Sequence, residues 1–404
     1  MILMASEGDA SSTAKEVEVL RGPHGWLNWY AERAGYPRRE QSHPDSIVIR
    51  PIWEEFALYS DVLLGGGWLT LGPYEFVPID HVLGANIGHA RKLVLLRSWD
   101  HLPDEPASGA PEIKTDVEDY VGGDIGDELS ALLSLALGCR FRSGGCVRQG
   151  LPIETLPVGL ADESRHRAPH LVPPHRGSLI DRLAAPRSLQ DAKPLLESYP
   201  TIDGPDAVAL VRSASQYADA LWLADADPRL AWIKFIGALE AAANRRDDLR
   251  QETPIAQLKR HKPKLYRQLK DGPEDALTVV AEETSRLFRA EAKVRSFVKA
   301  FDPGPPLSRP EGAGWHFDWS ELDDALKVIY NHRSRDLHDG IAFPWPLCEA
   351  PHLAEDNMPA ERFPALAVSG RGGRWEASEL PMYLHVFAHI VGGSLRNWWL
   401  SLKS

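Results

Sequence analysis

Cysteine is scarce in this chain, which limits the metal sites and disulfide frameworks that it can form. The 404 residues include three cysteines, Cys139, Cys146 and Cys348. Their spacing provides neither paired Cys-x-x-Cys motifs nor an even set of bridges. Reduced thiols are the usual state of such cysteines, so we expect a cytoplasmic protein without structural disulfides.

Long apolar runs and targeting signals are also missing. No stretch of the sequence approaches the roughly 20 apolar residues that a membrane-spanning helix needs. The first 19 residues have neither the basic flank nor the apolar core of a signal peptide. We therefore expect no membrane anchor and no membrane partner.

Basic residues are fewer than acidic ones. The chain has 45 Lys and Arg and 57 Asp and Glu, which gives a formal net charge of -12. This excludes a protein that coats nucleic acid with its whole surface, since phosphate binding depends on clustered cations. One exception is the segment 259–270, which holds six basic side chains and no acid. It is either a solvated helix face or a local RNA contact. The candidate RNA-binding residues are Lys259, Arg260, Lys262, Lys264 and Arg267.

The motifs of several common enzyme classes are absent as well. Gly65-Gly66-Gly67 lacks the Lys-Ser/Thr of a phosphate loop, and neither a nucleophile elbow nor a dinucleotide fingerprint occurs. His385 and His389 have the spacing of zinc ligands but no accompanying glutamate. Three more histidines lie among prolines, without an acid or thiol to complete a ligand set: His166, His170 and His175. We expect no cofactor and no bound metal.

What the sequence does contain is enough for two or three ordinary globular domains, with 43% hydrophobic and 25% charged residues. Short apolar runs with Gly and Pro predict a mixed or β-containing domain over 1–160, with one helix at 127–137 that stops at Gly138. A Pro- and His-rich linker is predicted over 161–204. An all-α bundle follows over 205–404, so the fold class is α+β. Its helices are predicted near 205–224, 228–246, 255–270, 273–301, 319–338 and 377–402.

One of these helices carries an unusual pair of side chains. Its expected apolar stripe includes a charged member and comprises Leu322, Leu326, Ile329, Arg333 and Leu337. An arginine on such a face needs a carboxylate, a bound anion or a partly wet cleft. His338 follows at the helix C-terminus, where the backbone dipole favours a protonated imidazole. The alternative is a buried salt-bridge arginine and a capping histidine.

The segment IYNHRSRDLHDG, which contains this pair, resembles the signature of the HEPN superfamily, and most closely its Apea-like branch. The upstream run YADALWLADADPRLAWIKFIGALEAAANRR resembles the same branch, in which this helix carries a glutamate, here Glu240. The resemblance covers about 205–404. Ser334 departs from it, because the family often has Asn, Asp or His directly after the motif arginine.

The resemblance implies a metal-independent endoribonuclease, used as a toxin or in defence against phage, that works as a homodimer on an RNA substrate. Arg333 and His338 take the positions of the motif residues, and Glu240 is expected to pair with Arg333. Candidates for supporting roles are Asn331, Ser334, Arg335 and Asp336. The domain over 1–160 would sense a trigger or restrain the site, and neither the trigger nor an antitoxin can be named. The alternative is a non-catalytic HEPN scaffold that binds RNA, a nucleotide or a partner protein.

The chemistry of RNA agrees with such a pair. A base that deprotonates the 2′-hydroxyl starts attack on the neighbouring phosphate and leaves a 2′,3′-cyclic phosphate without a metal. Five residues turn an ideal helix by about 140°, so Arg333 and His338 of one chain converge only if the last turn distorts. A second subunit would supply the missing group instead.

Overall fold

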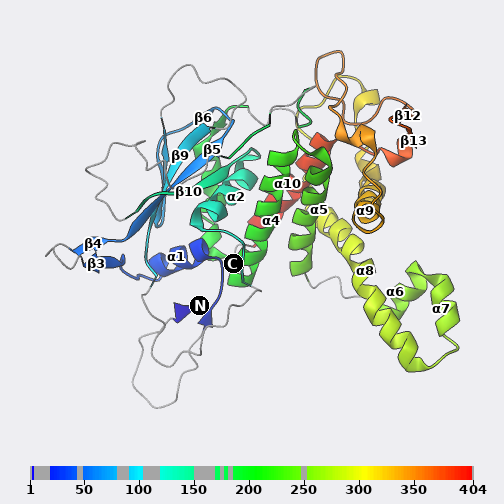
Figure 1. The fold of residues 1–404 in the computed structure, drawn as a ribbon, viewed down its shortest axis with the longest axis horizontal. Coiled ribbons are helices and arrows are strands. Elements are labelled where there is room, and N and C mark those ends of the chain that lie inside the picture. Colours follow the sequence, from blue (N-terminus) through cyan, green and yellow to red (C-terminus); the bar gives the residue numbers. More distant parts are fainter. Residues whose placement is uncertain are drawn as a thin grey trace. The chain divides into compact units, whose positions relative to one another are not determined.

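The computed structural model divides the chain into two compact units, which we call the N-terminal and C-terminal units (Figure 1). The N-terminal unit comprises Met1–Pro173, Arg182–Trp222 and Trp398–Ser404, and the C-terminal unit comprises Pro174–Asp181 and Leu223–Asn397. The structure describes residues 2–3, 19–42, 49–79, 91–102, 119–149, 169–172, 177–180, 185–246 and 253–402. A sheet region precedes a helical region, so the predicted α+β class is confirmed.

An antiparallel five-stranded sheet organises the N-terminal unit. Its strands, in spatial order, are β10 (Arg142–Gln149), β5 (Trp53–Ser60), β9 (Arg91–Trp99), β8 (Tyr74–Pro78) and β7 (Leu69–Leu71). Side chains alternate between the two faces of a strand, so a run such as β5 contributes to both. One face buries a cluster of Ala57, Tyr59, Val77, Leu95 and Val147.

The other face of this sheet supports a helix at the position that the sequence predicts. Helix α2 (Ile125–Leu137) approaches Phe56 so closely that a Cβ on its Gly126 would clash with that ring. Asp124 caps the helix start in a reciprocal box with Asp127. Gly138 ends it in the left-handed conformation, with φ of 63°.

The N-terminal unit also contains smaller elements and further helices. The helices are α1 (His24–Arg33), α3 (Lys193–Leu196) and α4 (Gly204–Leu223), and the short strands are β1 (Ile2–Leu3), β2 (Val19–Leu20), β3 (Glu40–Ser42), β4 (Ile49–Pro51), β6 (Leu64–Gly65) and β11 (Arg187–Ser188). Two predictions differ from this arrangement. The described part of the expected linker from 185 to 202 buries Leu189, Leu196 and Tyr199, and α4 up to Trp222 belongs to this unit, not to the C-terminal bundle.

The C-terminal unit is mainly helical. It contains α5 (Pro228–Arg245), α6 (Pro254–His261), α7 (Pro263–Leu269), α8 (Glu274–Ala300), α9 (Leu322–Asp339), most of α10 (Leu384–Ser401) and a hairpin of β12 (Ala367–Gly370) and β13 (Gly373–Glu376). Helix α5 is central, as its apolar sequence predicts. The ring of its Trp232 stacks on Phe387 at 4.9 Å, and the indole N–H donates to the Leu347 carbonyl at 2.9 Å.

Prolines shorten two of the predicted helices. The helix expected over 255–270 breaks at Lys262, because Pro263 has no N–H and starts α7 instead. The helix expected over 377–402 begins at Leu384, since Pro381 disfavours helical backbone in the residue before it. Within the described residues, no helix is both long and apolar enough to cross a membrane.

Candidate active site on helix α9

The buried face of α9 differs from the predicted stripe. Its buried residues are Leu322, Ala325, Leu326, Ile329, His332 and Asp336. Arg333 is instead half-buried beside this face, and Leu337 is 47% exposed, so its place in the stripe was wrong. At the end of α9, helical spacing is compatible with burial of either Arg333 and Leu337 or His332 and Asp336. Which pair is buried depends on which polar side chains have hydrogen-bond partners in the interior.

Arg333 is held by a carboxylate from the neighbouring helix α5. Its Nη2 donates to Glu240 Oε2 at 2.8 Å, so the pairing expected between these two side chains is present. Tyr330 completes the arrangement, because its hydroxyl donates to Glu240 Oε1 at 2.7 Å. The tyrosine ring also lies 5.5 Å from the guanidinium carbon, within cation–π range. The two side chains of the ion pair are 21% and 19% exposed, so the site is reachable from solvent.

The environment of this cluster is partly desolvated. Burial, and then the nearby Glu240 carboxylate, raise the pKa of Tyr330, so its hydroxyl stays protonated and acts as a donor. Arg333 Nε is buried and has no hydrogen-bond partner in the part of the chain that the structure describes. The guanidinium therefore has donor capacity that Glu240 does not use.

Asp336 is a structural anchor, not a solvent-facing helper. Arg229, in the first turn of α5, donates from Nε to Asp336 Oδ1 at 2.7 Å. The Asp336 side chain is fully buried, whereas the Arg229 side chain is 48% exposed. The pair thus joins the start of α5 to the end of α9. Sequence reasoning missed Arg229, whose only signal is its place beside the Asp227-Pro228 helix start.

His338 lies exposed in the last turn of α9. Among the described residues its side chain makes no hydrogen bond or ion pair. The helix is closed by backbone bonds, since Gly340 at φ of 67° donates its N–H to the Arg335 carbonyl. His338 is therefore not a side-chain cap, and its imidazole is available to a ligand.

The other candidates around the motif divide by exposure. Asn331 and Arg335 are exposed, and Ser334 is half-buried. His332 is buried and donates from Nε2 to the Glu379 carbonyl at 2.8 Å. Burial lowers the pKa of His332 and keeps the ring neutral. His332 is thus a packing residue, which leaves His338 as the accessible imidazole of this helix.

The two histidines on α10 also have structural surroundings. Burial lowers the pKa of His385 to about 4, and His389 Nε2 donates to the Gly304 carbonyl at 2.9 Å. Within the described residues, no group of three His, Cys, Asp or Glu side chains could hold a metal ion. His166 and His175 lie outside the described residues, and His170 is exposed.

A pocket of about 720 Å³ lies between α8 and the first half of α9. Arg295 of α8 crosses it and pairs with Asp323 of α9, with Nε to Oδ1 at 2.7 Å. Trp319 lies at its edge and donates from Nε1 to Asp302 at 3.1 Å. The pocket is thus lined by charges that are largely paired with each other.

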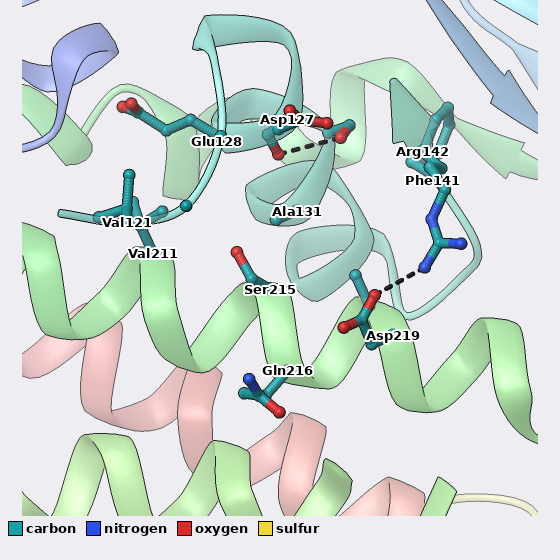
Figure 2. Close-up of a pocket in the computed structure, with 14 residues that line it drawn as sticks. Val121, Asp127, Glu128, Ala131, Phe141, Arg142, Val211, Ser215, Gln216 and Asp219 are labelled. Carbon is teal, nitrogen blue, oxygen red and sulfur yellow. Dashed lines mark hydrogen bonds and ion pairs between the residues drawn. The ribbon is translucent and has the colours of Figure 1, made fainter. Parts of the chain in front are cut away.

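A second pocket, of about 310 Å³, lies between α2 and α4 in the N-terminal unit (Figure 2). Arg142 closes one side through an ion pair with Asp219 at 2.6 Å. The Ser215 hydroxyl points from α4 toward α2, whereas the Glu128 carboxylate points away from both. That carboxylate accepts hydrogen bonds from the Gly25 N–H at 2.8 Å and from the Tyr199 hydroxyl at 2.7 Å. Its role is to fix α1, not to bind a ligand in this pocket.

The predicted RNA-binding residues lie on other helices than Arg333. Lys259 is on α6, Lys262 joins α6 to α7, and Lys264 and Arg267 are on α7; all four are exposed. The side chain of Arg260 lies outside the described residues.

Comparisons with protein-family models, with curated proteins and with solved structures find no match to this chain. The function therefore has to be argued from the geometry of α5 and α9 and from the motif that they carry.

Proposed function

We propose that the C-terminal unit is a metal-independent endoribonuclease of the HEPN type, with Arg333 and His338 as its catalytic residues. The observation that carries the proposal is the contrast between the two side chains on α9. Arg333 is oriented by Glu240 and Tyr330 and keeps unused donor capacity, while His338 is exposed and without a partner among the described residues.

These two groups supply what RNA cleavage needs. His338 removes the proton of the 2′-hydroxyl, and the resulting oxygen attacks the adjacent phosphorus. The bond to the 5′-oxygen breaks, and this oxygen takes up a proton and leaves as a 5′-hydroxyl. Arg333 donates hydrogen bonds to the non-bridging oxygens, where negative charge builds up in the transition state. The products are a 2′,3′-cyclic phosphate and a 5′-hydroxyl.

A homodimer is part of this proposal. The reaction needs one group to take a proton and another to return one, and His338 is the accessible imidazole of α9. Two copies related by a two-fold axis would bring two such histidines and two arginines to one cleft. We propose a cellular role as a toxin or phage-defence effector in the cytoplasm, because undirected RNA cleavage stops growth.

One observation favours a second candidate, a catalytically silent HEPN scaffold that binds RNA, a nucleotide or a partner protein. Glu240 already occupies one terminal nitrogen of Arg333 and competes with a phosphate for this guanidinium. In a scaffold this pair would be purely structural. Both candidates share the fold and differ in the cleavage of RNA.

The deciding experiment incubates the purified protein with RNA in the presence of EDTA. We expect cleavage with cyclic phosphate ends, and its loss by at least about 100-fold in Arg333→Ala and in His338→Ala. Asp324→Ala, a change at an exposed position of the same helix, is the matched control and should cleave normally. Cleavage that survives both motif substitutions would remove the assignment of the site, and no cleavage by the wild type would favour the scaffold.

A further inference from the structure

The basic segment of the sequence folds as a separate helical hairpin of the C-terminal unit, which we call the basic arm: α6, α7 and Lys270. Figure 1 shows α6 and α7 beside the N-terminal half of α8. From Pro254 to Lys270 the arm contains six Lys and Arg residues and no Asp or Glu, in a chain with a net charge of -12. So strong a local excess of one sign in an acidic protein indicates a partner of opposite charge.

The packing of the arm directs these charges outward. Helix α6 buries Gln257 and Leu258 while α8 buries Ala281, which fixes α6 along α8. Helix α7 buries none of its residues. A short helix without a buried face gains little stability from apolar packing. The neighbouring helices therefore stabilise α7, and its charged side chains are exposed to solvent.

Several cations of the arm have no acidic partner among the described residues. Lys262 and Lys264 are exposed and make no ion pair there, and Arg267 Nε donates to the Pro263 carbonyl at 3.2 Å. Lys270 Nζ lies 3.9 Å from an oxygen of the neighbouring Asp271 carboxylate. Exposed acids follow the arm on α8 at Asp275, Glu282 and Glu283.

An aromatic side chain lies among these cations. Tyr266 of α7 is half-buried, and Lys259 Nζ of α6 lies 5.8 Å from the centre of its ring. Cations that follow a phosphate backbone, together with an aromatic ring for stacking, are the usual means of binding a single strand without regard to sequence.

We propose that the basic arm binds a single RNA strand through its phosphates and guides it toward α9; this inference rests on the proposed function for its choice of ligand. Lys293 of α8 donates to Asn244 Oδ1 of α5 at 3.3 Å, one turn beyond Glu240, so the Arg333 cluster lies near that part of α8. Ala281, where the arm packs, is twelve residues earlier, which is about 18 Å along a helix. The arm therefore holds the strand several nucleotides away from the phosphate that is cleaved.

The test measures RNA binding separately from cleavage. In the His338→Ala background, a labelled 20-nucleotide single-stranded RNA is titrated at several salt concentrations. The double variant Lys262→Gln and Lys264→Gln is compared with Lys193→Gln and Lys327→Gln, two exposed lysines elsewhere in the chain. Each lost phosphate contact lowers the salt slope by about 0.7, so we expect a slope smaller by about 1.4 and binding about 25-fold weaker at 0.1 M salt. The control pair should bind like the parent.

A second measurement separates this inference from the nuclease assignment. In protein that retains His338, the double variant Lys262→Gln and Lys264→Gln should raise KM for the same RNA by a similar factor and leave kcat unchanged. The double variant Lys262→Arg and Lys264→Arg, which keeps both positive charges, should have the KM of the wild type. Equal affinity of arm and control variants would overturn the inference, as would a loss of kcat at unchanged KM. If the protein binds RNA through the basic arm but does not cleave it, the proposed endoribonuclease activity is refuted and the proposed RNA binding by the arm is supported.

Discussion

A single carboxylate links the two side chains that orient Arg333 in the proposed site. Glu240 accepts from Tyr330 with one oxygen and from Arg333 with the other. A carboxylate fixed on both sides has little freedom to rotate, so it holds the guanidinium in one orientation. Tyr330 is then a positioning residue, which acts through Glu240 and through the contact of its ring with Arg333.

The first prediction concerns this tyrosine. Tyr330→Phe keeps the ring but removes the hydroxyl donor to Glu240, so the guanidinium should be less well oriented. Loss of one hydrogen bond of about 1 kcal/mol corresponds to a kcat lower by roughly fivefold, with KM little changed. Steady-state cleavage of RNA by the two proteins measures it. Tyr330→Leu, which also removes the ring, should have a still lower kcat. If both variants cleave RNA with the kcat of the wild type, Tyr330 has no part in positioning Arg333.

The second polar pair between α5 and α9, Arg229 with Asp336, has two side chains that differ strongly in burial, and the sequence does not indicate this difference. Asp336 is fully buried, whereas Arg229 is about half exposed. Removing the aspartate would leave an arginine that water can solvate, but removing the arginine would leave a buried carboxylate with no cation. The stability of this junction therefore depends on Arg229, although Asp336 is the residue that lies within the motif.

At the scale of elements, α1 begins without a side-chain cap of its own, because its N-cap residue is Pro23. Glu128 of α2 takes that role and accepts the backbone N–H of Gly25, and it is also bonded by Trp26 and Tyr199. Burial raises the pKa of Glu128 to about 7, and the hydrogen bonds from Tyr199 and the two backbone groups limit the rise. One buried acid thus joins α1, α2 and the segment before α4.

The second prediction follows from this pKa. Because the folded value lies above the ordinary value of 4.5, the folded state binds the proton more tightly than the unfolded state. The stability that results is present at low pH and is lost as the pH rises to about 7. Between pH 5 and pH 8 the free energy of unfolding should fall by about 2 to 3 kcal/mol more in the wild type than in Glu128→Gln.

Urea unfolding at the two pH values measures this difference, and subtracting the variant removes the contribution of other titrating groups. Glu197→Gln, on the exposed side of α3, is the matched control and should retain the pH dependence of the wild type. A Glu128→Gln protein with the same pH dependence as the wild type would mean that Glu128 titrates normally in the fold.

The elements show what the sequence could and could not predict. Local signals located the start of α5 at Asp227-Pro228, the end of α2 at Gly138 and the end of α9 before Gly340, since caps and glycines act within one turn. Long-range partners gave no such signal. Glu55 on β5 lies buried against Arg97 on β9 at 2.7 Å, a pairing that strand register decides.

The same limit applies to the candidate site. The Glu240–Arg333 pair was expected from a resemblance between whole segments, and spacing alone could not supply it. Tyr330 was missed because a tyrosine on a helix is usually a packing residue. The sequence predicted Arg333 and Leu337 in the buried stripe of α9. Helical periodicity fits His332 and Asp336 equally well. Only their hydrogen-bond partners Glu379 and Arg229, which are distant in the sequence, show that these two residues are the buried ones.

At the scale of the whole molecule, the chain forms two compact units, and the longest segments of the two units meet at Trp222, near the end of α4. The C-terminal unit contains α5, α8 and α9, and so all the residues of the proposed site. The N-terminal unit has its own sheet, core and pocket, and we propose for it the sensing or restraining role that the sequence suggests.

The last prediction tests whether one cleft is built from two chains. Arg333→Ala lacks the phosphate ligand and His338→Ala lacks the base, so each homodimer should be inactive. A mixed dimer keeps one arginine and one histidine in a shared cleft, so it should cleave RNA at least about tenfold faster than either homodimer, but more slowly than the wild type because one of the two histidines is missing. The two variants are expressed together with different affinity tags, and dimers that carry both tags are isolated and assayed on RNA with EDTA. A dimer of Arg333→Ala with a chain that carries both Arg333→Ala and His338→Ala retains one histidine but no arginine and must stay inactive. Mixed dimers as inactive as either parent would mean that both groups have to come from the same chain, which the spacing of about 140° on α9 makes difficult unless its last turn rearranges.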